Sequence, residues 1–239
     1  MGKKKKNSNY VTEKREQARI EKEKERRAKK RNKILKAVLI PTVAVAVLAA
    51  LIFVIGLAVG WWYNNPNKDL TVTHHATIKI KDYGSVHIEL YGEEAPETVA
   101  NFVALANRGH YDGLAFHRIM NGFMAQGGEN PEFTPAQIKG EFSENGVNNN
   151  VKHVRGTISM ARTDVMDSAT DQFFIVHKTS KNNTLSLDGR YAAFGMVTDG
   201  MNVIDKMIKD TVKKGYTEYI SITSDRPVIE SITIHEVHD

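Results

Sequence analysis

Apolar and polar residues alternate over several short stretches in the part of the chain that follows residue 75. Residues 77–80 and 85–90 alternate with a period of two on either side of a turn-like segment at 81–84, which predicts a β-hairpin. Other stretches are short and almost continuously apolar, as buried strands are. On these two grounds, strands are predicted over residues 156–161, 172–176, 191–197 and 228–237.

Two stretches have helical periodicity instead. In residues 96–106 an apolar stripe begins at Val99 and recurs at i+3, i+4 and i+7, and Pro96 suits the first helical turn. Residues 201–208 predict a second, shorter helix. Many short strands with only two helices indicate a mainly β domain, either a barrel or a sandwich with helical caps.

Residues 116–128 combine a cation, an amide and apolar side chains in one predicted hairpin. Alternation places Phe116, Arg118 and Met120 on one face of the first strand. Asn121 and Gly122 predict the turn, because both residue types tolerate positive φ. Phe123 would open the second strand, in which Met124 and Gln126 share a face. A guanidinium and a carboxamide above an apolar surface suit a peptide backbone that carries a hydrophobic side chain.

A run of 27 residues, 37–63, contains no charged side chain. As a helix it would extend about 40 Å, more than the ~30 Å hydrocarbon core of a bilayer, so we predict a single transmembrane helix. Trp61, Trp62 and Tyr63 lie at its end, where aromatic side chains favour the membrane interface. The alternative is a cleaved signal peptide, whose apolar core is usually only about 7–15 residues long.

The net charge of +5 averages two opposite regions. Residues 1–36 hold 16 Lys/Arg and 5 Asp/Glu, a net charge of +11, and the remaining 17 basic and 23 acidic residues give −6. A basic arm before the apolar run predicts a cytoplasmic N-terminus and an extracellular domain, tethered to the cell membrane. The arm is typical of a solvated, disordered or marginally helical segment, and contact with anionic lipid is the alternative. Specific nucleic-acid binding is not expected, because Tyr10 is the only aromatic residue among the charges of the arm.

These shifts in composition divide the chain into four parts. They are a basic arm at 1–36, a transmembrane helix at 37–63, a polar linker at 64–74 and an outer domain at 75–239. Cysteine is absent, which excludes disulfides, thiol catalysis and cysteine metal sites. Histidines at 74, 75, 235 and 238 suggest a metal, but no further ligand at a suitable spacing supports one, so we expect none.

Three blocks in the outer domain resemble, in order and spacing, the signature of the cyclophilins, the peptidyl-prolyl cis-trans isomerases. They are FHRI with GFMAQGG at residues 116–128, SMAR with QFFI between 159 and 175, and LDGR with AFG between 187 and 195. Residues 95–102 are also similar to the first helix of the family. The resemblance extends over about residues 75–237, and the pattern is similar to that of bacterial members.

The resemblance implies an eight-stranded antiparallel barrel closed by two helices, with a proline-binding groove on its outer surface. Carried over residue by residue, Arg118 is the expected catalytic arginine, with Gln126 and Phe123 beside it. The groove is further expected to bind substrate through an apolar pocket, a second amide and the main chain of one segment. The residues implied are His117, Met124, Ala161, Arg162, Gln172, Phe174, Leu187 and Tyr191.

The chemistry of prolyl isomerisation agrees with these residue types. The partial double bond of the amide gives a barrier of about 20 kcal/mol, and nothing is cleaved when it rotates. No nucleophile, metal or cofactor is therefore needed. In the transition state the proline nitrogen becomes pyramidal and gains a lone pair, so a guanidinium that donates to it stabilises the twisted amide more than the planar one.

Several positions depart from the family pattern. Ser186 stands where many members carry a tryptophan that contributes to cyclosporin binding, so the resemblance does not extend to sensitivity to that drug. Tyr191 replaces a frequent histidine, and Met120 and Met166 stand where proline is common. We expect a monomeric foldase acting on proline-containing, exported polypeptides. The alternative is a non-catalytic chaperone or scaffold, which would need the pocket but not the arginine.

Overall fold

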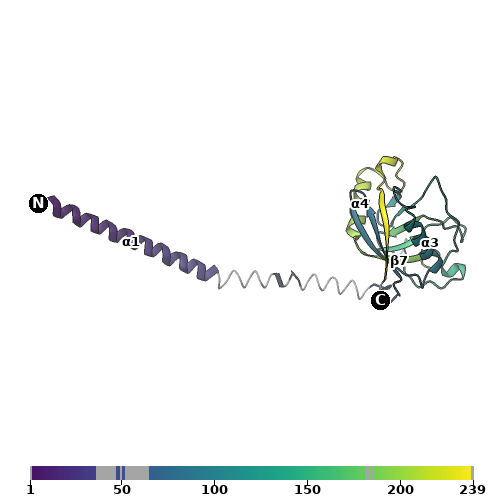
Figure 1. Ribbon diagram of the computed structural model, residues 1–239, viewed down its shortest axis with the longest axis horizontal. Coiled ribbons are helices and arrows are strands. Elements are labelled where there is room, and N and C mark those ends of the chain that lie inside the picture. Colours follow the sequence, from purple (N-terminus) through teal and green to yellow (C-terminus); the bar gives the residue numbers. More distant parts are fainter. Residues whose placement is uncertain are drawn as a thin grey trace. The chain divides into compact units, whose positions relative to one another are not determined.

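The computed structural model describes residues 2–35, 47–48, 50–51, 65–180, 184 and 186–237. The chain divides into two compact units, Met1–Asn65 and Pro66–Asp239. The second unit, here called the β-rich unit, holds every strand of the described chain and two of its helices, α3 and α4, which are labelled in Figure 1. Its architecture is mainly β, as the alternating pattern predicts.

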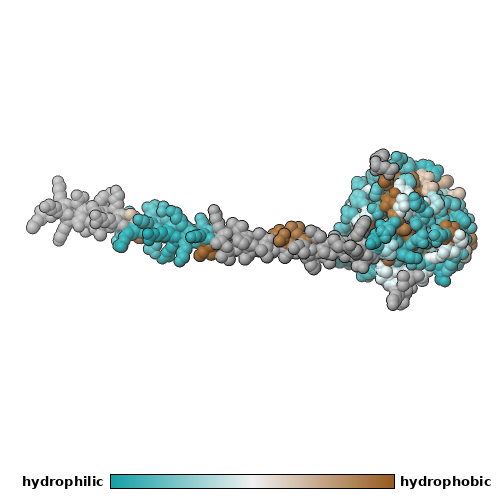
Figure 2. All heavy atoms as spheres, turned by 90° about the horizontal axis from the view of Figure 1, so that it is seen from below, coloured by the Kyte–Doolittle hydropathy of each residue, from teal (hydrophilic) through white to brown (hydrophobic). Residues whose placement is uncertain are grey.

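The basic arm forms one continuous helix, α1, from Gly2 to Ile34. Its described side chains, from Glu16 onward, are all exposed, and Figure 2 shows this part almost uniformly hydrophilic. Arg27 and Glu23, one helical turn apart, form an exposed ion pair at 2.8 Å. Pairs at this spacing support isolated helices, so the arm is more helical than its composition suggests.

The predicted transmembrane helix at 37–63 lies almost entirely outside the described residues. Only 47–48 and 50–51 are described there, and they are helical. Among the helices of the described chain, none is both long enough and apolar enough to cross a membrane.

Eight antiparallel strands form one curved sheet in the order β3-β4-β6-β5-β7-β2-β1-β8. The strands are β1 (His74–Ile80), β2 (Gly84–Leu90), β3 (Phe116–Met120), β4 (Met124–Gly127), β5 (Thr157–Met160), β6 (Phe173–Val176), β7 (Ala193–Asp199) and β8 (Ile229–Glu236). The hairpin predicted over 77–90 is the β1–β2 pair, and Asp82 has a positive φ of 67° in its turn.

The two edge strands of this sheet, β3 and β8, approach each other without forming a ladder. They meet at a single bridge between Ala115 and Val228, beside hydrogen bonds from Phe116 N to the Pro227 carbonyl at 2.8 Å and from Ile229 N to the Leu114 carbonyl at 2.7 Å. The sheet is therefore a half-barrel whose edges touch at one point, rather than the continuously closed barrel that the resemblance implies.

The inner face of the half-barrel encloses the main hydrophobic core. Phe102 lies at its centre, with ring centroids of Tyr111, Phe173 and Phe194 within 5.2–5.7 Å. All four rings are fully buried. Tilted and edge-to-face contacts of this kind stabilise aromatic clusters beyond the area they bury.

Helix α3 (Pro96–Asn107) packs against β8, and α4 (Met201–Lys213) packs against β2 and β3. Pro96 opens α3 as expected, and the carboxylate of Glu141 accepts hydrogen bonds from the next two main-chain amides, Glu97 N at 3.0 Å and Thr98 N at 2.7 Å. A negative charge at a helix N-terminus is stabilised by the helix dipole. Helix α4 runs five residues beyond the predicted 201–208.

The β3–β4 hairpin differs from the predicted alternation. Phe116 pairs with Gly127 and Arg118 with Gln126, so the register shifts at His117. Because of this bulge, Phe116 is fully buried in the main core while Arg118 lies on the outer face. The prediction that these two residues share a face is therefore wrong. Phe123 lies in the turn, where only Gly122 has positive φ, and the second strand starts at Met124.

Most of the predicted linker at 64–74 belongs to the β-rich unit, which begins at Pro66. Asn67 is 1% exposed, and its side chain donates to the Lys152 carbonyl at 3.0 Å and accepts from Lys152 N at 2.8 Å. Leu70 and Val72 pack against a small apolar cluster that includes Tyr91.

Candidate active site

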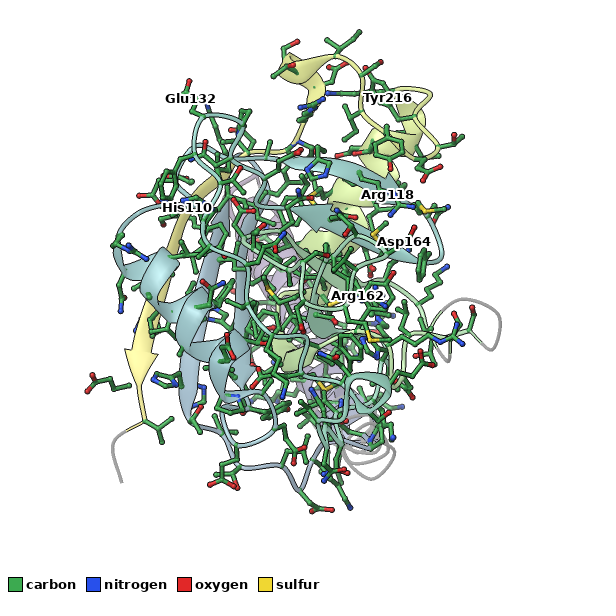
Figure 3. The ribbon with its side chains drawn as sticks, turned by 90° about the vertical axis from the view of Figure 1, so that its right-hand side faces the viewer. His110, Arg118, Glu132, Arg162, Asp164 and Tyr216 are labelled. Atoms are coloured by element: carbon green, nitrogen blue, oxygen red, sulfur yellow. The ribbon has the colours of Figure 1, made fainter. Side chains whose placement is uncertain are left out.

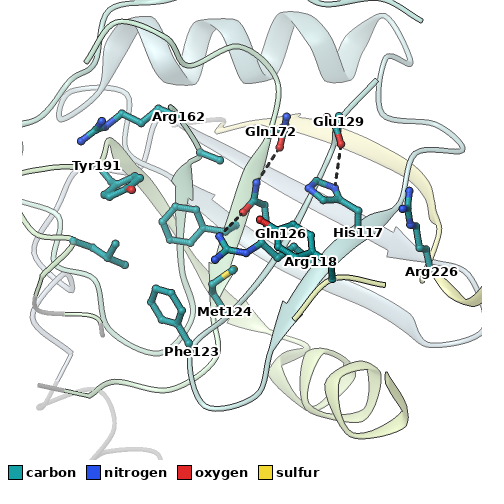
Figure 4. Close-up of a pocket in the computed structure, with 14 residues that line it drawn as sticks. His117, Arg118, Phe123, Met124, Gln126, Glu129, Arg162, Gln172, Tyr191 and Arg226 are labelled. Atoms are coloured by element: carbon teal, nitrogen blue, oxygen red, sulfur yellow. Dashed lines mark hydrogen bonds and ion pairs between the residues drawn. The ribbon is translucent and has the colours of Figure 1, made fainter. Parts of the chain in front are cut away.

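One groove on the outer face of the sheet, with a volume of about 560 Å³, contains every residue expected to act on substrate. Those residues are His117, Arg118, Phe123, Met124, Gln126, Ala161, Arg162, Gln172, Phe174, Leu187 and Tyr191. Three further residues line it: Glu129, Tyr219 and Arg226. Figure 3 shows Arg118 and Arg162 on the same side of the molecule, and Figure 4 shows the groove in close-up.

Strand pairing brings the central residues together. Gln126 of β4 lies opposite Arg118 of β3 on one side and opposite Phe174 of β6 on the other. Phe174 in turn lies opposite Ser159 of β5. Side chains directly opposite each other on one face of an antiparallel sheet are in contact, so the sheet register itself assembles this part of the groove.

Arg118 is held by several groups at once. Its Nε and Nη2 donate to Glu218 Oε1 at 2.9 and 2.7 Å, and its Nη1 donates to Gln126 Oε1 at 3.3 Å. The guanidinium carbon lies 5.4 Å from the centre of the Tyr219 ring. The side chain remains 28% exposed, so it can still reach a ligand in the groove.

Two glutamines continue this hydrogen-bond chain across the groove. Gln126 accepts from Arg118 and donates through Nε2 to Gln172 Oε1 at 2.9 Å, as the dashed lines in Figure 4 show. Each contact determines which way the next amide faces. The Nε2 group of Gln172 is therefore left directed away from Gln126, where a peptide carbonyl could accept from it.

The other side of the groove is an apolar cluster separate from the main core. Met124, Phe174, Val176 and Leu187 are its buried members, and each is 7% exposed or less. Partly buried side chains of Met120, Phe123, Ala161 and Tyr191 pack against it. A concave apolar surface of this size next to a few fixed polar groups is typical of small-ligand sites.

A buried hydrogen-bonded group formed by His153, Asp188 and Ser159 lies against the ring of Phe174, on the side of His153. His153 stacks against Phe174 with ring centroids 6.2 Å apart and is 1% exposed. Asp188 Oδ1 accepts from both His153 N and Nδ1 at 2.8 Å, and His153 Nε2 is 3.0 Å from Ser159 Oγ. Burial raises the pKa of Asp188, but the hydrogen bonds from His153 outweigh it and hold that pKa below its usual value.

This Ser–His–Asp arrangement has the order of a hydrolytic triad but not its accessibility. Ser159 is fully buried, so its hydroxyl cannot reach a substrate carbonyl. The three groups instead satisfy one another beneath the apolar pocket. They hold Phe174 and the Leu187–Asp188 segment in place.

Arg162 lies at the far end of the groove, where its guanidinium carbon is 4.7 Å from the centre of the Tyr191 ring and 5.0 Å from that of Phe142. Its Nη1 donates to the Thr163 carbonyl at 2.7 Å and its Nε to the Arg190 carbonyl at 2.9 Å. Tyr191, which stands where a histidine is frequent, therefore serves as a stacking surface for this arginine.

His117 occupies the end of the groove nearest Glu129 and Arg226. Burial lowers the pKa of its imidazole below the usual value; Glu129 opposes this effect, whereas the nearby Arg226 and Arg118 add to it. Its Nδ1 has no hydrogen-bond partner among the described residues, since Glu129 Oε2 at 3.9 Å is too distant. The lowered pKa favours the neutral imidazole, and Glu129 forms an ion pair with His117 only when that ring is protonated.

The arrangement suits binding and polarisation of a peptide. In the described part of the chain, no three His, Asp or Glu side chains cluster in a way that would hold a metal. At its centre the groove combines the Arg118 guanidinium, the two oriented amides of Gln126 and Gln172, and an apolar pocket.

Sequence reasoning missed four residues around Arg118 and His117. Glu129 follows the first block directly, whereas Glu218, Tyr219 and Arg226 lie in the connection between α4 and β8, outside all three blocks. Residues 216–220 contain tyrosine, threonine and isoleucine, which are common in strands, but they do not alternate strictly, so this signal is weak.

Comparison with known proteins agrees with this geometry. The model of the family "Cyclophilin type peptidyl-prolyl cis-trans isomerase/CLD" matches residues 75–238. Peptidyl-prolyl cis-trans isomerase B of Escherichia coli strain K12 is 37% identical over 161 residues, covering 65% of this chain and 96% of that protein. Peptidyl-prolyl cis-trans isomerase A of Dickeya dadantii is 36% identical over 191 residues, covering 79% of this chain and 96% of that protein.

A solved structure has the same fold. It is a cyclophilin type peptidyl-prolyl cis-trans isomerase of Cryptosporidium parvum, crystallised in the presence of the dipeptide Ala-Pro. The TM-score is 0.56 at 25% identity, and the match covers 68% of this chain and 99% of that chain. This chain therefore belongs to the cyclophilin-type peptidyl-prolyl cis-trans isomerases. It is an isomerase of that family, with a half-barrel sheet and an outward-facing groove.

Proposed function

We propose that Arg118 catalyses the isomerisation of X-Pro bonds by donating a hydrogen bond to the proline nitrogen of the twisted amide. We further propose that the substrates are exported or surface polypeptides. The observation that carries the first proposal is the position of the Arg118 guanidinium. It lies partly exposed, within hydrogen-bond reach of Gln126, beside the apolar cluster formed by Met124, Phe174 and Leu187.

The apolar cluster is where the proline ring would bind. Burial of a five-membered ring against Phe123, Met124 and Phe174 would hold the nitrogen side of the amide while the preceding carbonyl rotates. Gln172 would donate to a carbonyl of the substrate, with Gln126 keeping its amide in the correct orientation. Main-chain groups near Ala161 and Arg162, at the wall of the groove, would align the peptide.

Rate acceleration requires an interaction that is stronger in the transition state than in the ground state. A planar amide nitrogen has little basicity, because its lone pair is delocalised, whereas the twisted nitrogen can accept a hydrogen bond. A fixed, permanently charged donor at that nitrogen therefore favours the twisted state selectively. The groove needs no group that gains or loses a proton for this step.

The cellular location is a separate proposal, based on the sequence. The uncharged run at 37–63 would anchor the chain in the cell membrane, and the basic arm before it would remain on the cytoplasmic side, near anionic lipid. The β-rich unit would then lie outside the cell as a monomer. Protease treatment of intact cells tests this orientation, because digestion of the β-rich unit is expected and complete protection would contradict it.

The test of Arg118 compares the full-length chain with its Arg118→Ala variant in an X-Pro peptide isomerisation assay. We expect kcat/KM to fall by about 10²–10³-fold, the usual effect of removing one transition-state donor. Arg108→Ala is the matched control, because Arg108 is exposed at the end of α3, outside the groove, and its side chain donates to the Ala104 carbonyl of that helix. This control is expected to keep the wild-type rate.

The same experiment distinguishes catalysis of isomerisation from binding of proline-containing segments without catalysis. If Arg118→Ala isomerises the peptide as fast as the wild type, the proposed role of Arg118 is wrong. If neither protein accelerates isomerisation while both bind proline-containing segments, the chain is a chaperone or scaffold instead. Binding is measured in parallel with the same peptide, so the two outcomes are distinct.

A further inference from the structure

Glu218 makes the shortest contacts that Arg118 forms. A single carboxylate oxygen, Oε1, accepts from Arg118 Nε at 2.9 Å and from Nη2 at 2.7 Å. The two residues are 100 positions apart in the chain. The side chain of Glu218 is 39% exposed and that of Arg118 is 28% exposed, and an ion pair this accessible contributes little to the stability of a fold.

The five N–H donors of the guanidinium can be assigned one by one. Glu218 accepts from Nε and Nη2, Gln126 accepts from Nη1, and the second Nη2 hydrogen faces Met120 Sδ at 3.5 Å. The described residues thus leave one Nη1 hydrogen for a substrate. Because Glu218 occupies the Nε edge, the guanidinium presents its Nη1 corner to the groove, towards Gln126.

The main chain holds Glu218 in this position. Ile119 N donates to the Glu218 carbonyl at 2.7 Å, and Ile220 N donates to the His117 carbonyl at 2.9 Å. Residues 218–220 therefore run along the outer edge of β3 and place Tyr219 opposite Arg118. This pairing places the tyrosine ring over the guanidinium and fixes the main chain from which the Glu218 side chain reaches Arg118.

We propose that Glu218 is a positioning residue for prolyl isomerisation, which holds the Arg118 guanidinium so that one Nη1–H points at the proline nitrogen. The inference rests on the proposed function of Arg118 and adds a residue outside the three sequence blocks. Glu218 does not touch the substrate. It acts by restricting the rotation of a long, flexible side chain before the substrate binds.

A role in positioning has a kinetic signature that a structural role lacks. The apolar pocket is untouched when Glu218 is removed, so KM for an X-Pro peptide is expected to stay within about twofold. We expect kcat of Glu218→Ala to fall about tenfold, less than the ~100-fold that a full ångström of misplacement can cost. Glu218→Gln keeps an acceptor oxygen at the same reach, and because neutral acceptors are about half as strong, its kcat is expected to fall only about threefold.

The control is Glu230→Ala, which removes another exposed glutamate from a 2.8 Å ion pair, that with Lys79 between β8 and β1, away from the groove. Its kcat and KM are expected to match the wild type. The melting temperature of each variant is measured as well, and we expect no change in any of them. A lower kcat for Glu218→Ala in a chain that melts normally supports positioning.

The double variant separates this inference from the proposed function. In an Arg118→Ala background, Glu218→Ala should cause no further loss, because there is no guanidinium left to position. If Arg118→Ala is slow but Glu218→Ala has wild-type or higher kcat, the positioning role is wrong and the role of Arg118 stands. If the two losses multiply in the double variant, Glu218 acts through something other than Arg118, which also overturns the inference.

Discussion

The two sides of the groove are built in different ways. The apolar side is part of a packed cluster, in which Met124, Phe174 and Leu187 are 2%, 5% and 7% exposed. On the polar side, Arg118 is 28% exposed and is held by hydrogen bonds instead of by packing. We therefore expect the apolar side to determine peptide affinity and the stability of the fold, and the polar side to determine the catalytic rate.

Replacing Phe174 by alanine is expected to have the largest effect. The substitution opens a cavity beneath the proline pocket and removes the ring that stacks on His153. We expect a loss of about 3–5 kcal/mol in the free energy of unfolding, as for other buried phenylalanines. Peptide affinity is expected to fall about 100-fold, the loss of the about 2–3 kcal/mol that burying such a ring contributes.

Denaturant titration and peptide titration measure these two losses separately. Phe133→Ala is the control, because Phe133 is 58% exposed and lies outside the groove. Undiminished peptide affinity in Phe174→Ala would mean that the apolar side is core rather than pocket.

Replacing Gln126 by alanine tests the polar side. The change removes the acceptor for Arg118 Nη1 and the donor to Gln172, but leaves the apolar cluster intact. We expect kcat to fall about tenfold with KM changed by less than threefold, since the lost contacts orient rather than bind. The exposed Gln137→Ala serves as control. A rise in KM with normal kcat would assign Gln126 to binding instead.

The turn between the two strands of this hairpin should make stability depend on pH. Gly122 N donates to His177 Nδ1 at 3.0 Å, so that nitrogen must be unprotonated. Burial lowers the pKa of His177, and Arg155 and Lys178 add to the effect, although Asp205 opposes it. The folded state therefore binds this proton less readily than the unfolded chain does.

The direction of the pH dependence follows from the linkage between proton binding and folding. The contribution of neutral His177 is complete above the unfolded pKa of about 6.5 and is lost as the pH falls towards the lower folded value. We expect the free energy of unfolding to decrease between pH 7.5 and pH 5.5, and to decrease less in His177→Asn, whose side-chain oxygen can still accept from Gly122 N. Equal pH dependence in the two proteins would contradict this assignment.

The groove residues that belong to the three sequence blocks could be predicted from the sequence because each block is local. Arg118 and Gln126 belong to one hairpin, and the pairing of short strands carries their neighbours to the same face. Such patterns indicate which residues approach one another when the strands pair consecutively or when a family signature supplies the order. All eleven expected residues accordingly lie in the groove, while their individual roles remain predictions.

The other residues around Arg118 and the register shift in β3 depend on long-range pairing, which the alternation of polar and apolar residues does not encode. Glu218 and Tyr219 reach Arg118 only because their segment adds to the outer edge of β3, a pairing across 100 residues. The bulge at His117 likewise moves Phe116 into the core, contrary to simple alternation. Neither feature has a composition signal strong enough to be recognised before the sheet order is known.

Exchange spectroscopy on a bound X-Pro peptide tests whether Arg118 is the catalytic residue, because it measures interconversion of the amide on the protein separately from binding. On the full-length wild type, the bound isomers should interconvert far faster than the tens to hundreds of seconds typical of free peptides. In Arg118→Ala, we expect the peptide to remain bound while interconversion slows by about 10²–10³-fold. Equal interconversion rates on the two proteins, with equal occupancy, would contradict the assignment of Arg118 as the catalytic residue.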